Sequence, residues 1–169
     1  MKVLAPLLAL LIAGCSTTAR FDAAGDVHDL LVAVRDNDRA AFERHIDRDA
    51  LRRQIESRMV REARDSPGAL RSIGIALAQP GAAMAEAMLL QPRVLRMAAE
   101  HSGYTPDQPI PGRSAIAGSL KHLDDGRVCA TRTKGGECLL VFTERNGTWR
   151  PTGFEGELSD LRTALSIAK

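Results

Sequence analysis

Residues 127–154 read RVCATRTKGGECLLVFTERNGTWRPTGF, and this stretch decides the fold. Short runs rich in Val, Thr, Leu, Phe and Trp are separated there by glycine-containing turns, which is the pattern of strands joined by hairpins. Together with the segment before it, the stretch predicts four strands, over Ser114–Leu123, Arg127–Thr133, Glu137–Thr143 and Thr148–Phe154. Because the turns are short, we expect the strands to pair antiparallel as a meander.

The chain before residue 103 is predicted to be helical. Asp26 is expected to cap the first helix, whose apolar face is formed by Val27, Leu30, Leu31 and Val34. Further helices are expected after Asp38, over Arg48–Arg64, over Pro92–His101 and, beyond the strands, over Leu158–Ile167. This order predicts an α+β fold, with the N-terminal helices on one face of a four-stranded antiparallel sheet and a C-terminal helix closing it.

Residues 69–90, ALRSIGIALAQPGAAMAEAMLL, form the most apolar segment after the first fifteen residues. Pro80 and Gly81 interrupt it, so two short helices are expected. We favour a buried helix pair in which Ala and Gly allow close packing. The alternatives are the wall of an apolar cavity and contact with a membrane. Arg71 and Glu86 argue against a helix that crosses a bilayer.

The helix expected over Arg48–Arg64 has a strongly charged side. Its arginines alternate with acidic residues. Such a surface either binds anionic lipid headgroups or is a solvated face with ion pairs between neighbouring turns. Because acidic and basic side chains nearly alternate, we favour the solvated face.

The first fifteen residues, MKVLAPLLALLIAGC, begin with a charge at Lys2 and continue as an apolar run that ends in small residues before Cys15. This is the pattern of a secretory signal, and the run is shorter than the about 20 residues that a spanning helix needs. The stretch Leu11-Ile12-Ala13-Gly14-Cys15 resembles the lipobox of bacterial lipoproteins. The alternative is an ordinary secretory signal in which Cys15 has no role.

The lipoprotein resemblance implies how the chain is processed. The thiol of Cys15 would be acylated, the signal of residues 1–14 cut off, and the new amine acylated in turn, with acyl chains such as palmitate. Residues 15–25 would then be a lipidated N-terminus and short tether, and residues 26–169 a single α+β domain. Ser16 implies transfer to the outer membrane, facing the periplasm.

The composition is that of an ordinary globular domain. Removing residues 1–14 from the 169-residue chain leaves 155 residues, enough for one core. Without Lys2 the chain has 22 basic and 21 acidic residues, which argues against nucleic acid as a partner. Aromatic residues make up 4% of the chain, so stacking platforms for bases or sugars are not expected.

Two cysteines remain besides Cys15, namely Cys129 and Cys138. An even remainder in an oxidising compartment predicts a disulfide between them. A two-residue turn at Gly135-Gly136 would place Phe142 opposite Cys129, and the two sulfurs would then be too far apart to bond. We therefore expect a wider loop that places the cysteines directly opposite each other. The alternative is a pair of small buried apolar residues.

No arrangement of residues predicts catalysis or a metal site. The four histidines, His28, His45, His101 and His122, have no metal-ligand spacing to another ligand, and the chain contains no Gly-x-Ser-x-Gly or phosphate-binding loop. We therefore expect no enzyme activity, no cofactor and no metal.

Three stretches resemble a bacterial family of unknown function, domain-of-unknown-function family 2939. They are Leu31–Leu51, Ala69–Met97 and Val141–Gly153. The first and last also look like the NTF2-like and cystatin-like α+β folds, and that likeness implies that Trp149 covers the core between sheet and helices. The family supplies no catalytic residues.

Two roles are expected for such a protein. The first is a membrane-anchored envelope lipoprotein that docks a protein partner or has a structural role. The second is a binder of a small apolar ligand or lipid, held in a cavity between the Ala69–Leu90 helices and the sheet.

Overall fold

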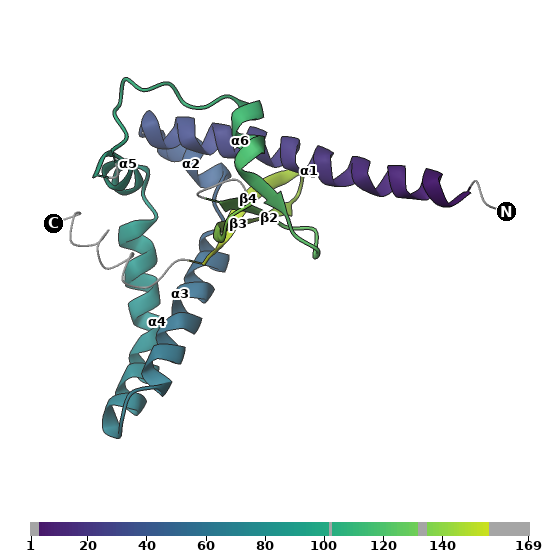
Figure 1. Ribbon diagram of the computed structural model, residues 1–169. Helices are drawn as coiled ribbons and strands as arrows, with labels where there is room; N and C mark the ends of the chain where they lie inside the picture. The colour runs from purple at the N-terminus through teal and green to yellow at the C-terminus, as the bar shows by residue number, and fades with distance from the viewer. Residues whose placement is uncertain (1–3, 102, 132–134, 156–169) are drawn as a thin grey trace.

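The structure is a computed structural model that describes residues 4–101, 103–131 and 135–155, with side-chain exposure described from Thr17 onward. Within these residues it is an α+β fold, as predicted (Figure 1). The helices are α1 (Leu4–Arg35), α2 (Arg39–Arg44), α3 (Arg48–Arg64), α4 (Ala69–Leu89), α5 (Pro92–His101) and α6 (Arg113–Ser119). The strands are β1 (Leu120–His122), β2 (Val128–Thr131), β3 (Cys138–Arg145) and β4 (Thr148–Phe154). The expected helix Leu158–Ile167 lies outside the described residues.

The four strands form one antiparallel sheet in the order β1-β2-β3-β4, which confirms the predicted meander. The turn between β3 and β4 has positive φ at Asn146 (54°) and Gly147 (76°), as a tight two-residue hairpin turn requires. The first predicted strand, Ser114–Leu123, is wrong over most of its length. Its first residues form α6, because a helix there buries Ile116 and Ala117 in the core beside α1.

The disulfide between Cys129 and Cys138 is present, and their Cα atoms are 5.6 Å apart. The expected register is wrong, because Cys129 lies opposite Val141 and Cys138 lies opposite Thr131. The ladder shifts between Ala130 and Thr131, and this irregularity accompanies the diagonal position of the two cysteines.

Helix α1 does not begin at Asp26 but runs through it without a break, so the predicted N-cap is wrong. In place of the expected tether over residues 15–25, the chain is helical there, and Ala23 and Ala24 are fully buried. The carboxylate of Asp26 instead accepts a hydrogen bond of 2.7 Å from the backbone N–H of Trp149. This bond ties the middle of α1 to the start of β4.

Helices α3 and α4 form an antiparallel hairpin that projects away from the sheet (Figure 1). The two short helices expected over residues 69–90 are a single helix with Pro80 inside it. Pro80 lies on an exposed part of α4, so solvent can reach the carbonyl of Ala76, which lacks the N–H that a residue other than proline would donate. Gly81 lies at the contact with α3, where an added Cβ would be 2.6 Å from the Cε of Met59.

The core lies between the sheet and helices α1, α2 and α6, with contributions from the first part of α3. Helices α1 and α3 both pack against β4, whereas α4 packs mainly against α3. Trp149 is buried within this core, which confirms the position that the resemblance implied. The layer of helices on the sheet is therefore formed by α1 and the first part of α3. The sheet with α1, α2 and α6 is here called the body, and the hairpin of α3 and α4 projects from it.

Candidate functional site

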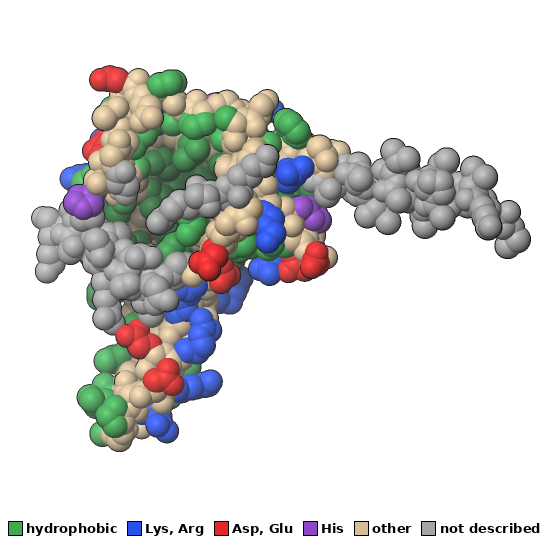
Figure 2. Space-filling model, in the orientation of Figure 1, with side chains coloured by type: hydrophobic (Ala, Val, Ile, Leu, Met, Phe, Trp, Pro, Cys, Tyr) green, Lys and Arg blue, Asp and Glu red, His purple; other side chains and the backbone are tan. Residues whose placement is uncertain are grey.

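An apolar pocket of about 240 Å³ lies where the hairpin joins the body. Helices α1, α2, α3 and α5, the end of α4 and strands β3 and β4 all contribute to its walls. The lining residues are Leu30, Phe42, Ile46, Leu51, Gln54, Ile55, Arg58, Leu89, Leu90, Val94, Leu95, Ala98, Leu140, Pro151 and Phe154. Figure 2 shows hydrophobic side chains inside the hollow at this position. Among these described lining residues, Gln54 and Arg58 are the polar ones.

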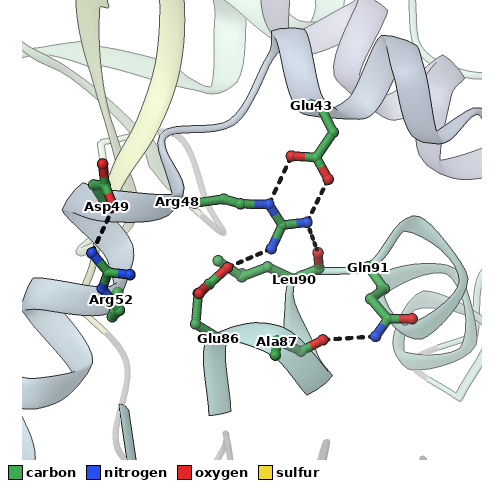
Figure 3. Close-up of polar contacts among 8 residues, drawn as sticks. All are labelled: Glu43, Arg48, Asp49, Arg52, Glu86, Ala87, Leu90 and Gln91. Carbon is green, nitrogen blue, oxygen red and sulfur yellow. Dashed lines mark hydrogen bonds and ion pairs between the residues drawn. The ribbon is translucent and has the colours of Figure 1, made fainter. Parts of the chain in front are cut away.

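The guanidinium of Arg48 holds together the three helices at one side of this pocket (Figure 3). It donates two hydrogen bonds to Glu43, from Nε at 2.7 Å and from Nη2 at 2.5 Å. It also donates to the Oε1 of Glu86 at 2.6 Å and to the backbone oxygen of Leu90 at 2.7 Å. Arg48 therefore joins α2, the first turn of α3 and the end of α4.

The cluster of Arg48, Glu43 and Glu86, here called the Arg48 cluster, is only partly exposed, with 28%, 37% and 14% of the side-chain surface accessible. The hydrogen bond to Glu43 raises the pKa of Arg48, and the same bond lowers the pKa of Glu43 below its ordinary value. Arg48 and Glu43 are therefore ionised near neutral pH. The cation also lies at the C-terminal end of α4, where positive charge is favourable. The cluster fixes Leu89 and Leu90, which line the pocket.

Gln54 and Arg58 hold the opposite wall by binding the backbone of Phe154. The side-chain amide of Gln54 donates to the carbonyl of Phe154 at 2.7 Å and accepts from its N–H at 2.6 Å. Arg58 donates to the same carbonyl, and its guanidinium carbon lies 5.6 Å from the centre of the Phe154 ring. Gln54 thus pairs with the end of β4 as a neighbouring strand would. Its amide group and the Phe154 backbone are satisfied by each other.

A second polar contact orders the body beside the pocket. The Nδ1 atom of His45 lies 3.6 Å from the Oδ1 of Asp26, too far for a hydrogen bond. Asp47 accepts a hydrogen bond from the backbone N–H of Ala50, as the cap of α3, and pairs with Arg145 at 2.9 Å. The pair of Asp47 and Arg145 connects the start of α3 to β3. Neither His45 nor Asp26 is among the described residues that line the pocket.

The site residues expected from sequence lie elsewhere. Cys15 is within α1, in the part whose side chains are not described, and Cys129 and Cys138 form their disulfide away from the pocket. The expected cavity against the Ala69–Leu90 segment exists only at the end of that segment, at Leu89 and Leu90. The rest of α4 lies on the projecting hairpin.

The described residues contain no group of three or more His, Cys, Asp or Glu side chains that could hold a metal ion. Nor does any single helix among them have the length and apolar character needed to cross a membrane. Helices α4 and α5 would satisfy both conditions only as a pair, and they are bent by 75° where they meet.

Comparison with known families finds a match for the helical part of this α+β protein. A family described as protein of unknown function, DUF2939, matches residues 8–100, which is more than half of the chain. The protein belongs to this family. The match includes α1 to α5 and so most of the pocket wall, whereas Val141–Gly153 of the expected resemblance lies outside it. No curated protein and no solved structure matches the chain significantly, so the likeness to NTF2-like and cystatin-like folds stays a prediction.

Proposed function

We propose that this protein is a lipid-anchored, non-catalytic protein of the cell envelope that binds a short apolar chain in the pocket between the hairpin and the body. The observation that carries the proposal is the apolar lining of the pocket, since all of its described residues except Gln54 and Arg58 are Leu, Ile, Val, Phe, Ala or Pro. Ligand sites are typically concave and apolar with few polar groups. The pocket favours ligand binding over the purely protein-docking role.

The volume of the pocket sets the size of the ligand. An apolar cavity of about 150 Å³ accepts benzene, and one water takes about 30 Å³ of liquid. By that scale, the 240 Å³ here holds a chain of about eight to ten carbons. A whole diacyl lipid does not fit.

The anchor part of the proposal rests on the N-terminal sequence and on α1. Cleavage before Cys15 and acylation of its thiol would leave a helix whose first residue carries the lipid. Eight residues separate Cys15 from Ala23, which corresponds to about 12 Å of helix. The lipid would therefore be attached through a short rigid stem, and the body would face the periplasm close to the outer membrane.

Native mass spectrometry and titration with decanoate test the ligand part. The protein purified from cells is expected to carry an apolar molecule, and the delipidated protein is expected to bind decanoate. Val94→Phe adds a ring to a residue that lines the pocket and is expected to abolish binding. Arg93→Phe is the matched control, because it adds the same ring at the exposed neighbouring position. Equal binding by the two variants would contradict the proposal.

The chain continues from Phe154, a lining residue, into the segment where the sequence predicts an apolar helix face at Leu158, Leu161 and Leu165. The experiment therefore includes the variant Leu161→Gln/Leu165→Gln. Tighter decanoate binding by this variant identifies the segment as a competitor for the pocket. If the variant and the parent both fail to bind, the pocket is not a ligand site.

Incorporation of labelled palmitate in growing cells tests the anchor part. Label is expected in the parent and not in Cys15→Ser, and the parent is expected in the outer-membrane fraction. Recovery of an unlabelled chain that keeps its first methionine would overturn the anchor. It would leave the ligand proposal standing, because the described residues that line the pocket begin at Leu30.

A further inference from the structure

Helix α4 has its small residues against α3 and its large ones toward solvent. An added Cβ at Gly74 would be 2.7 Å from the Cβ of Ala63, so the two helices approach closely there. Ala78 and Ala82 on the same side are buried. On the α4 side the contact with α3 is thus formed largely by small residues, and Met59 of α3 packs against one of them, Gly81.

Five of the six exposed large apolar residues of α4, here called the α4 stripe, are exposed by 48% to 66%; the sixth, Ile75, lies on another side of the helix. They are Leu70, Ile73, Leu77, Met84 and Met88. The spacings of three, four and seven residues put them in one row along the helix. A water-exposed helix places its large apolar residues inward, so a continuous outward row marks a surface that another phase or molecule covers.

The arrangement of small residues between helices and large apolar residues outside is that of helices in lipid. In a bilayer, helix contacts are formed by Gly and Ala, because the surrounding acyl chains are as apolar as Leu. A protein partner in water would not by itself explain why α4 turns Gly and Ala toward α3 and its row of Leu, Ile and Met outward.

Positive charge accompanies the stripe at the end of the hairpin. Arg61 and Arg64 in the last turns of α3 and Arg71 in the first turn of α4 are exposed, beside the acidic Glu62 and Asp65. Figure 2 shows basic side chains along one edge of the hairpin and hydrophobic ones at its tip. Basic side chains next to an exposed apolar row favour the surface of an anionic bilayer.

We infer that the α4 stripe docks onto an anionic lipid bilayer, with α4 lying in the interface and its apolar row directed into the acyl region. Leu70 and Met88 are eighteen residues apart, or about 27 Å of helix, so several turns contact lipid at once. Glu86 does not oppose this, because its carboxylate is paired with Arg48 on the side toward the body. The inference goes beyond the proposed function and involves neither Cys15 nor the pocket.

Photo-crosslinking with peptide mapping tests the docking. The full chain carrying Cys15→Ser, and so no acyl group, is mixed with phosphatidylcholine vesicles that contain roughly 30 mol % phosphatidylglycerol and a lipid with a diazirine in its acyl chain. After irradiation, adducts are mapped by mass spectrometry. Adducts are expected on peptides from residues 69–89, separately from any on the apolar N-terminus. Omitting phosphatidylglycerol is expected to lower their yield.

Two triple variants make the test specific. Leu70→Gln/Leu77→Gln/Met84→Gln changes the stripe and is expected to lower the adduct yield on residues 69–89 by at least about tenfold. Ala76→Gln/Ala83→Gln/Ala87→Gln changes exposed positions of the same helix outside the stripe, and its yield is expected to stay within about twofold of the parent. Both should retain the parent's circular dichroism.

Equal adduct yield in the two variants, or no adduct on residues 69–89 in the parent, would overturn the inference. A concentration-dependent dimer without lipid that the stripe variant abolishes would also overturn it, because the stripe would then be covered by a second copy of the chain. Val94→Phe, which fills the pocket, is expected to leave the adduct yield unchanged. A failure of the ligand proposal is therefore distinguishable from a failure of the docking inference.

Discussion

Replacing Arg48 with Met is expected to destabilise the fold and loosen the pocket wall. The substitution removes two hydrogen bonds to Glu43, one to Glu86 and one to the carbonyl of Leu90. It also leaves the carboxylate of Glu86 without its cation at 14% side-chain exposure.

The magnitude follows from the burial of the cluster. Hydrogen bonds to charged groups contribute about 1.5–3 kcal/mol, and breaking a fully buried ion pair costs about 3–5 kcal/mol. Since 28% of the Arg48 side chain is exposed, solvent screens the pair, and we expect a loss of about 2–3 kcal/mol in the free energy of unfolding. For a chain of this size that corresponds to a Tm lower by about 4–12 °C.

Urea unfolding followed by circular dichroism measures this loss, with Arg52→Met as the matched control. Arg52 lies on the same helix and pairs with Asp49, but 43% and 66% of the two side chains are exposed, so its loss should cost about 0–1 kcal/mol. A double-mutant cycle with Glu86→Gln is expected to show coupling with Arg48. If Arg48→Met costs no more than Arg52→Met, the Arg48 cluster does not stabilise the junction and the reasoning is wrong.

Three further expectations concern other parts of the fold. Gly74→Val should lower the free energy of unfolding by about 1–3 kcal/mol in a urea titration, because even a Cβ would be 2.7 Å from the Cβ of Ala63. Ala76→Val, on the exposed side of the same helix, is the control. Cys129 and Cys138 are nine residues apart, so reducing their disulfide should lower the free energy of unfolding by about 2–3 kcal/mol. An unchanged Tm in reductant would contradict this expectation. The hydrogen bond from Arg48 lowers the pKa of Glu43 in the folded chain, so the contribution of Glu43 to the free energy of unfolding is complete above the ordinary carboxyl pKa. This contribution is lost as the pH falls through the lower folded pKa. Glu43→Gln should therefore make the acid decline of the free energy of unfolding less steep, as measured by urea unfolding at several pH values.

Local patterns predicted much of the fold. Asn146 and Gly147, Asp47 before α3 and the turn at Asp124–Gly126 each mark a boundary by their own chemistry, and the structure has a hairpin or a helix start at each. The α+β order and the antiparallel meander follow from those boundaries.

Tertiary contacts decided the features that the sequence did not reveal. The strand propensity of residues 114–119 was overridden because a helix buries Ile116 and Ala117 against α1. Pro80 did not divide α4, because its ring is on an exposed side and the helix is held by contacts with α3 on both sides of it. The cysteine register depended on an irregularity in the ladder that no turn residue marks.

The pocket was the least predictable feature, because its polar supports join residues far apart in the chain. Arg48 and Glu86 are 38 residues apart, and Gln54 and Phe154 are 100 residues apart. Neither separation matches the three- or four-residue repeat of a helix or the two-residue repeat of a strand, so no sequence pattern indicates these contacts. The apolar Ala69–Leu90 segment was interpreted first as a buried helix pair, with a cavity wall as an alternative, and the pocket involves only its last two residues.

Intermolecular nuclear Overhauser effects between ¹³C-labelled decanoate and the protein's methyl groups test the ligand proposal most directly. We expect contacts from the decanoate chain to the methyl groups of Leu90, Val94 and Leu140, which line the pocket from the α4–α5 junction, α5 and β3. Contacts to Leu70 and Leu77 on the hairpin instead, or no contacts at saturating decanoate, would contradict the account.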